Sequence, residues 1–330
     1  MDRSHLRLAF LIVGVGLLLV PVGSAADEAA IVEVYEDILL PDQDENAIFD
    51  TFKKLRPRVR LFSRGMLDGD FGSADVDWVR FEGRVSLPLP VSEKLVLSPT
   101  ISGGGTSYDF DGNRGFLNAG QNPGSDPFDD LYNIQIRLGG RYLYDDDWAA
   151  VGAIWVSSQY EDGADFADAV RPGGSIGVSH QFFEGFTLIG GVGISEKFDG
   201  GVSVAPFIQG SWKVNDWLKV ETEGLGLEAT AKVSDSLRVS LFGGVNSTRY
   251  LLDDRNDGPG GVGEGWIRDR RLPVGVGVEW RITKRFRLHF DVGAMLDQEL
   301  KVIDEDDDTF DDESLDSVAP FASVRFEARF

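Results

Sequence analysis

Residues 286–296, FRLHFDVGAML, alternate between two kinds of side chain. Every second position is apolar: Phe286, Leu288, Phe290, Val292, Ala294 and Leu296. The first three positions between them are polar: Arg287, His289 and Asp291. Successive side chains of a β-strand point to opposite faces, so this pattern predicts a strand with one apolar and one polar face. The same period recurs in residues 79–89, 132–142 and 272–281.

Alternation alone does not tell which face meets water, because soluble β-sandwiches alternate as well. The connections decide it, since short links (145–147, 215–216, 283–284) alternate with long ones (104–129, 159–173, 298–317). Outer-membrane barrels have short periplasmic turns and longer outer loops. We therefore expect an all-β fold, an antiparallel transmembrane β-barrel of about 12 to 14 strands over residues 58–330, with short periplasmic turns and long acidic outer loops.

Residues 217–233 lie between two short turns, so the chain must go up and return within this segment. Each arm is then shorter than the 9 to 11 residues of a typical spanning strand. We expect a short hairpin with Glu223 and Gly224 at its tip, which gives either fourteen strands or twelve full strands and an irregular pair.

The N-terminal residues have the features of an export signal. Arg3 and Arg7 precede an apolar run that ends before small residues at Ala25 and Ala26. This order predicts a cleaved signal peptide over residues 1–25. Residues 26–57 then form a periplasmic lead-in, for which a helix, a plug and a disordered segment all remain open. The predicted location is the outer membrane of a diderm bacterium.

The composition excludes some partners. The chain has 55 acidic and 32 basic residues, a net charge of -23, and no cysteine. Binding to nucleic acid phosphates depends on Lys and Arg, so this balance argues against nucleic acid. Without cysteine, the exported chain has no disulfides, and hydrogen bonding and packing must stabilise it.

The C-terminal segment, residues 320–330, alternates in the same way and ends in Phe330. A terminal aromatic residue preceded by alternating apolar residues resembles the signal by which the barrel assembly machinery of the outer membrane recognises its clients. The resemblance implies that this machinery is a partner of the last strand. Outer-membrane lipid and lipopolysaccharide are the other expected partners, and the oligomeric state stays open.

A wider resemblance extends over most of the chain from about residue 58. Its best-marked part runs from Val204 through Trp212, Trp217, Gly224 to Leu227, Ser234 to Leu237, and Leu241 to Gly244. This part looks like a functionally uncharacterised family of bacterial outer-membrane β-barrels. The resemblance implies a fold and a location, and it brings no catalytic residue.

Candidate chemistry is sparse. Beyond the signal peptide, the histidines are His180 and His289, and neither lies in a motif typical of a hydrolase. Residues 298–317 hold ten carboxylates, but Thr309 and Leu315 occupy positions where an EF-hand needs Gly and Glu. We expect no enzyme activity, no catalytic residue, no cofactor and no resident metal. Weak bridging of divalent cations to lipopolysaccharide by the acidic loop remains open.

The polar face of the strands is rich in arginine. Because arginine on the lipid face would cost about 2–4 kcal/mol at the bilayer midplane, these residues should face the lumen. The predicted channel-lining set is Arg80, Glu82, Arg84, Arg137, Arg141, Arg238, Arg271, Glu279, Arg281, Arg287, Asp291, Arg325, Glu327 and Arg329.

Two functions fit this set. The first is a narrow porin-like channel for passive transport of small solutes, with a preference for anions because Arg exceeds carboxylate along the wall. The second is a structural or surface-interaction barrel with a closed lumen, whose acidic outer loops bind partners or divalent cations.

Overall fold

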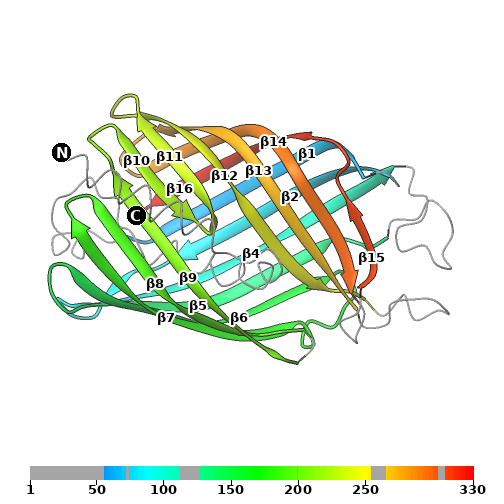
Figure 1. Cartoon of the computed structure of the whole chain (residues 1–330), viewed down its shortest axis with the longest axis horizontal. Coiled ribbons are helices and arrows are strands. Elements are labelled where there is room, and N and C mark those ends of the chain that lie inside the picture. Colours follow the sequence, from blue (N-terminus) through cyan, green and yellow to red (C-terminus); the bar gives the residue numbers. More distant parts are fainter. Residues whose placement is uncertain (1–55, 72–73, 112–126, 199, 254–264, 304–308) are drawn as a thin grey trace.

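The computed structural model describes residues 56–71, 74–111, 127–198, 200–253, 265–303 and 309–330. This part of the chain is all β-structure (Figure 1). In it, no helix is long and apolar enough to cross a membrane. The predicted signal peptide, and the lead-in up to residue 55, lie outside the described residues.

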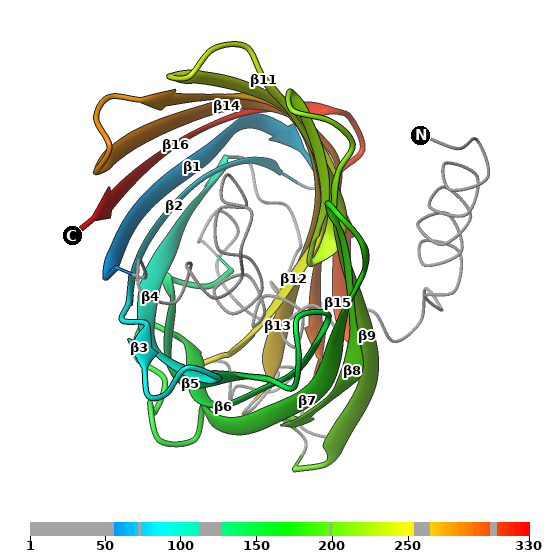
Figure 2. The same cartoon turned by 90° about the vertical axis from the view of Figure 1, so that its left-hand side faces the viewer.

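Fourteen of the strands form a closed antiparallel ring, in which each strand pairs with its neighbours along the chain and the last pairs with the first (Figure 2). They are β1 (Arg58–Asp70), β2 (Asp75–Ser86), β4 (Leu95–Asp111), β5 (Leu131–Leu143), β6 (Trp148–Glu161), β7 (Val170–Phe183), β8 (Phe186–Glu196), β9 (Val202–Lys213), β10 (Leu218–Glu223), β11 (Leu225–Lys232), β12 (Leu237–Leu251), β13 (Trp266–Arg281), β14 (Phe286–Ile303) and β16 (Ala319–Arg329). Two short strands lie beside the ring: β3 (Leu89–Pro90) pairs with β4, and β15 (Thr309–Ser314) pairs with β14. The predicted antiparallel barrel of 12 to 14 strands is confirmed, with fourteen.

The two ends of the barrel differ. At one end, here called the turn end, short turns such as 144–147 and 184–185 join the strands, and Arg58 pairs with Arg329. The opposite end, here called the loop end, carries the longer connections. In Figure 1 the C-terminus lies at the turn end, on the left. The predicted separation of short and long connections is therefore present.

The predicted short hairpin is also present. β10 and β11 have 6 and 8 residues and are joined by Gly224 alone, whose φ of +59° is left-handed. β10 pairs with β9 at three positions, 219–221 with 213–211. β11 pairs with β12 only as far as Leu225 with Val245. The hairpin therefore stops well below the loop end.

Several strands are longer than the sequence suggested. Residues 104–111 continue β4, and residues 298–303 continue β14, although both segments were expected to lie in loops. The glycines at 103–105 suggested a loop, but in the strand they allow the neighbouring backbone to approach closely. A Cβ on Gly104 would lie 2.1 Å from the Phe81 carbonyl oxygen. At 18 residues, β14 is far longer than the 9 to 11 residues that a bilayer requires.

The outer surface of the ring is apolar. Phe81, Ile154, Ile176 and Val292 are each more than 60% exposed, at 62%, 64%, 71% and 63%. Near the turn end Trp148 stacks on His180 at 4.0 Å, and Tyr142, Trp217 and Trp280 are exposed. A band of exposed aliphatic residues with aromatic residues at its edge is the surface that a bilayer requires.

Candidate functional site

The lumen begins with the inward face of β16, β1 and β2. Their register places Arg60 between Glu327 and Arg84, and places Arg64 opposite Arg80. Across β1 and β2, two arginine pairs therefore lie directly opposite each other. Like charges in that position destabilise a sheet. Carboxylates offset part of this cost, because Glu327 accepts a hydrogen bond from Arg60 at 3.0 Å and Glu82 pairs with Arg80 at 3.2 Å and with Arg84 at 3.4 Å.

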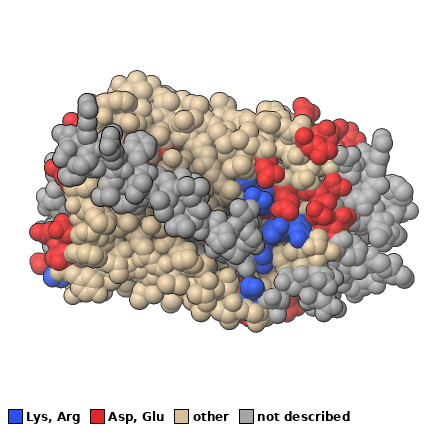
Figure 3. Space-filling model, in the orientation of Figure 1, with Lys and Arg blue, Asp and Glu red and all other residues tan. Residues whose placement is uncertain are grey.

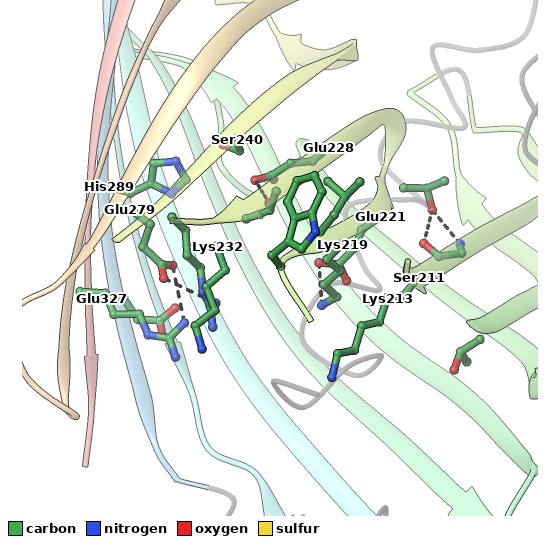
Figure 4. A pocket seen from close by; sticks show the side chains of 18 of the residues that line it. Ser211, Lys213, Lys219, Glu221, Glu228, Lys232, Ser240, Glu279, His289 and Glu327 are labelled. Atoms are coloured by element: carbon green, nitrogen blue, oxygen red, sulfur yellow. Dashed lines mark hydrogen bonds and ion pairs between the residues drawn. The ribbon is translucent and has the colours of Figure 1, made fainter. Parts of the chain in front are cut away.

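A cavity of about 290 Å³ lies inside the barrel near the turn end. The short β10–β11 hairpin lies with β8 and β9 on one side of it, and β12, β13, β14, β16 and β1 lie on the other, with side chains pointing toward each other (Figure 4). Nine basic residues and five acidic residues line it. The basic ones are Arg58, Arg60, Lys213, Lys219, Lys232, Arg238, Arg287, Arg325 and Arg329. The acidic ones are Asp216, Glu221, Glu228, Glu279 and Glu327.

A second cavity of about 190 Å³ lies farther from the turn end and shares Arg60, Glu228, Ser240, His289 and Arg325 with the first. Its basic residues are Arg60, Arg64, Arg80, Arg84, Arg271 and Arg325, and its acidic residues are Glu82, Glu228 and Asp291. Both cavities therefore carry an excess of positive charge. Because they share lining residues, they form one basic region of the lumen.

The loop end of the lumen is filled. Seventeen buried residues form an apolar cluster there, here called the outer cluster, which includes Met66, Trp78, Tyr250, Met295 and Leu300. A polar network lies against it: Asp269 accepts hydrogen bonds from Tyr108 at 2.6 Å and from Gln298 at 3.0 Å, and it pairs with Arg271. Side chains of the described residues thus pack together at the loop end, above the basic region.

The loop end is also closed by a change of strand partner. Leu251 at the end of β12 pairs with Tyr160 of β6, so β12 reaches across β7, β8 and β9. The buried Glu161 holds this junction, because its carboxylate accepts the backbone N–H of Asp129 at 2.7 Å and of Asp253 at 2.8 Å.

The structure places eleven of the fourteen predicted channel-lining residues on the two cavities: Arg80, Glu82, Arg84, Arg238, Arg271, Glu279, Arg287, Asp291, Arg325, Glu327 and Arg329. Arg137 and Arg141 alternate with outward-facing residues of β5, but they line neither cavity, and Arg137 is buried. Arg281 lies at the turn end of β13, opposite Arg287, and lines neither. That any of these residues lines a conducting path remains a prediction.

Sequence reasoning missed the charged residues of the short hairpin and the end of β9. Lys213, Lys219 and Lys232 line the first cavity, and Lys219 pairs with Glu221 at 2.7 Å. A signal for them existed, since Lys219, Glu221 and Glu223 occupy alternate positions. It was weak because each arm is too short to show a clear period.

His289 and Asp291 lie side by side on the inward face of β14. The imidazole Nε2 is 2.8 Å from the Asp291 carboxylate, and the Ser323 hydroxyl donates a hydrogen bond to the same carboxylate. In a nucleophilic triad the imidazole lies between hydroxyl and carboxylate. Here the carboxylate lies between the other two, so this order does not activate the hydroxyl. The expectation that the chain is not an enzyme stays a prediction.

His180 faces outward, stacks on Trp148 and meets Phe182 edge to face, whereas Ser179 is buried on the opposite face. Within the described ranges, no group of three or more His, Asp or Glu side chains is placed to hold a metal ion. Residues 304–308 of the acidic loop lie outside those ranges, so the divalent-cation hypothesis for that loop stays open.

A closed β-barrel with an apolar outer surface and a charged lumen is the construction of a transmembrane barrel of the outer-membrane type. The chain has that construction. No family model matches the chain, and no curated protein matches it. The resemblance to an uncharacterised barrel family therefore stays a prediction.

Solved structures with a similar fold include an outer membrane channel from Pseudomonas putida F1, with 8% identity, 88% of this chain and 100% of that chain covered, and a TM-score of 0.44. A FadL homologue from Pseudomonas aeruginosa has 11% identity, 83% and 90% coverage, and a TM-score of 0.46. The toluene transporter TodX from P. putida has 10% identity, 93% and 94% coverage, and a TM-score of 0.38. At these values the neighbours carry no argument about what this chain transports or binds.

Proposed function

We propose that this chain is a narrow outer-membrane channel for the passive transport of small anionic solutes. The observation that carries the proposal is the basic region of the lumen, where two adjoining cavities are lined by more arginine and lysine than carboxylate. Rings of positive side chains select anions in pores. In the outer membrane, the turn end faces the periplasm and the loop end faces outward.

The opposed arginines strengthen this argument. Arg60 with Arg84, and Arg64 with Arg80, repel each other across β1 and β2, and the repulsion lowers stability. A lumen that served only as packing would gain stability by replacing these residues with apolar ones of similar volume. A role in holding anions in transit accounts for a basic wall of this kind.

The outer cluster favours a second candidate function. Because apolar side chains fill the loop end of the described lumen, a barrel that stays closed would act as an anchor, with its acidic outer loops binding partners or divalent cations. For the channel function, the outer cluster is a constriction that must widen for a solute to pass.

Single-channel conductance of the refolded protein in a planar bilayer, under a salt gradient, tests the proposal. We expect discrete steps with anion preference. In the double variant Arg60→Gln/Arg84→Gln the anion preference should fall severalfold, because two positive charges leave the basic region of the lumen. The matched control is Arg285→Gln, which removes the same type of charge from an exposed turn. A folded barrel without conductance steps would reject the channel and leave the anchor.

We also propose that the last strand is recognised by the barrel assembly machinery. β16 pairs with β1 at nine positions and so closes the ring, and Phe330 follows it at the turn end. Deletion of Phe330 should reduce the amount of folded barrel in the outer membrane of intact cells. Unchanged assembly kinetics after this deletion would contradict the proposed role.

A further inference from the structure

Outward-facing charged residues gather on β12, β13 and β14 near the loop end. On β13 the outward positions from Trp280 through Val276 to Leu272 are apolar, and then the series changes to Arg270 and Arg268. On β14 the change comes one pair earlier in register, because Asp297 lies opposite Leu272 and Glu299 lies opposite Arg270. We call Arg249, Arg268, Arg270, Glu299 and Lys301 the rim patch.

We propose that the rim patch binds the phosphate groups of lipopolysaccharide in the outer leaflet. Its level in the membrane supports this assignment. An outward arginine destabilises a barrel strongly at the bilayer midplane but only slightly near the interface. The change from Leu272 to Arg270 therefore marks the height at which hydrocarbon ends and headgroups begin.

The patch contains a row of three cations. Arg249 lies directly opposite Arg268, and Arg268 lies directly opposite Lys301 on the next strand. Cations in such positions repel each other unless an anion lies among them. On the side nearer the apolar belt, Glu299 pairs with Arg268 at 3.0 Å and with Arg270 at 3.8 Å, and Asp297 lies 3.9 Å from Arg270. On its other side Lys301 lies opposite Asp312 of β15, although it makes no ion pair with any residue in the described part of the chain.

Two further features shape the site for a large anionic lipid. The Arg249 guanidinium lies 4.2 Å from the centre of the Trp266 ring, which fixes one end of the row. Arginine binds phosphate with two parallel hydrogen bonds, and lysine acts as a point charge beside it. On the face shown in Figure 3, positive and negative side chains gather toward the right-hand end, beyond a broad uncharged area. A ligand with a phosphate headgroup and acyl chains matches both the charged rim patch and the uncharged surface beside it. Free phosphate matches only the rim patch.

The test measures binding of purified lipopolysaccharide to the refolded full-length barrel in detergent, by native mass spectrometry and by the shift of the unfolding midpoint. The probes are intact lipopolysaccharide, the same lipid after removal of its phosphates, and inorganic phosphate. We expect intact lipopolysaccharide to bind at least about tenfold more tightly than the dephosphorylated lipid, a difference of about 1.4 kcal/mol. Equal binding of the two lipids, or full stabilisation by inorganic phosphate alone, would overturn the proposal.

Variants then locate the site. Arg249→Gln/Lys301→Gln should abolish most of the preference for the phosphorylated lipid. Lys284→Gln/Arg285→Gln, which removes the same two charges from an exposed turn at the other end, should leave it unchanged. Should the first double variant fold poorly, Lys301→Gln alone keeps the ion pairs of Glu299 with Arg268 and Arg270 and should still weaken binding severalfold. Unchanged binding in a folded Lys301→Gln barrel would exclude the rim patch, whatever the conductance experiment shows.

Discussion

The guanidinium carbon of Arg271 lies 3.6 Å from the centre of the Trp78 ring, at the boundary between the basic region of the lumen and the outer cluster. The indole nitrogen of Trp78 donates a hydrogen bond to Gln298 at 3.0 Å, and Gln298 in turn donates to Asp269. One buried tryptophan thus joins the polar network to the apolar closure. The contact is a cation–π interaction in a site shielded from water, where such contacts are strongest.

Replacing Trp78 by Ala tests whether this closure limits conduction. Loss of a buried tryptophan should lower the free energy of unfolding by roughly 3–5 kcal/mol. It should also raise single-channel conductance if solutes pass through the loop end. Urea unfolding in detergent and bilayer recordings give the two values. The control is Trp280→Ala, where the ring is 50% exposed on the outer surface, and conductance should stay at the wild-type value. Equal conductance in both variants would show that the outer cluster does not restrict the path.

Glu161 should stabilise the loop end. In Glu161→Ala the amides of Asp129 and Asp253 lose their acceptor, at a cost of about 1–3 kcal/mol for each amide left unsatisfied. The expected result is faster limited proteolysis at the loop end with the rest of the ring intact. Glu184→Ala, in an exposed turn, is the control. A proteolysis rate equal to that of the wild type would show that Glu161 does not stabilise the loop end.

Glu327→Gln tests the charge balance at the closure of the ring. Glu327 accepts from Arg60 at 3.0 Å and also from Arg329. Loss of this buried carboxylate leaves two guanidinium groups less well neutralised, which should cost about 3 kcal/mol. In the channel hypothesis the same change increases anion selectivity, because the first cavity loses one negative charge. Chemical unfolding measures the stability, and reversal potentials measure the selectivity. An unchanged or higher free energy of unfolding, or a lower anion selectivity, would contradict the role given to Glu327.

Gly224→Ala should weaken the short hairpin. The φ of +59° at Gly224 is left-handed, and an L side chain there costs roughly 1–2 kcal/mol. Gly83→Ala is the matched control, since its added Cβ would meet the nearest atom at 3.6 Å, an ordinary contact, with no left-handed φ. Differential unfolding in detergent compares the two. Equal stability of both variants would show that the hairpin relaxes without cost.

The sequence predicted the wall better than the interior. Strict alternation, as at Phe286, Leu288 and Phe290, reports the face of each side chain directly, because the period of a strand is two. It does not report how far a side chain reaches into the lumen. Arg137 and Arg141 alternate as cleanly as Arg80 and Arg84, yet they line neither cavity.

The closure of the loop end was outside the reach of local patterns. It depends on Glu161 meeting Asp253, 92 residues away, and on Trp78 meeting Gln298, 220 residues away. The outer cluster also takes apolar residues from positions where the alternation predicted a polar lumen, such as Met295 on β14. Such contacts follow from the three-dimensional arrangement of the strands.

The strands of the ring are not all paired over the same length. β1 and β16 are joined at nine register positions, whereas β9 and β10 are joined at three. A barrel wall is stiff where its ladder is long, so deformation concentrates at the β9–β10 seam. Lateral pressure from the bilayer would change the shape of the barrel's cross-section by bending the wall at this seam. The amides of residues 211–213 should therefore exchange with deuterium earlier than those of β16.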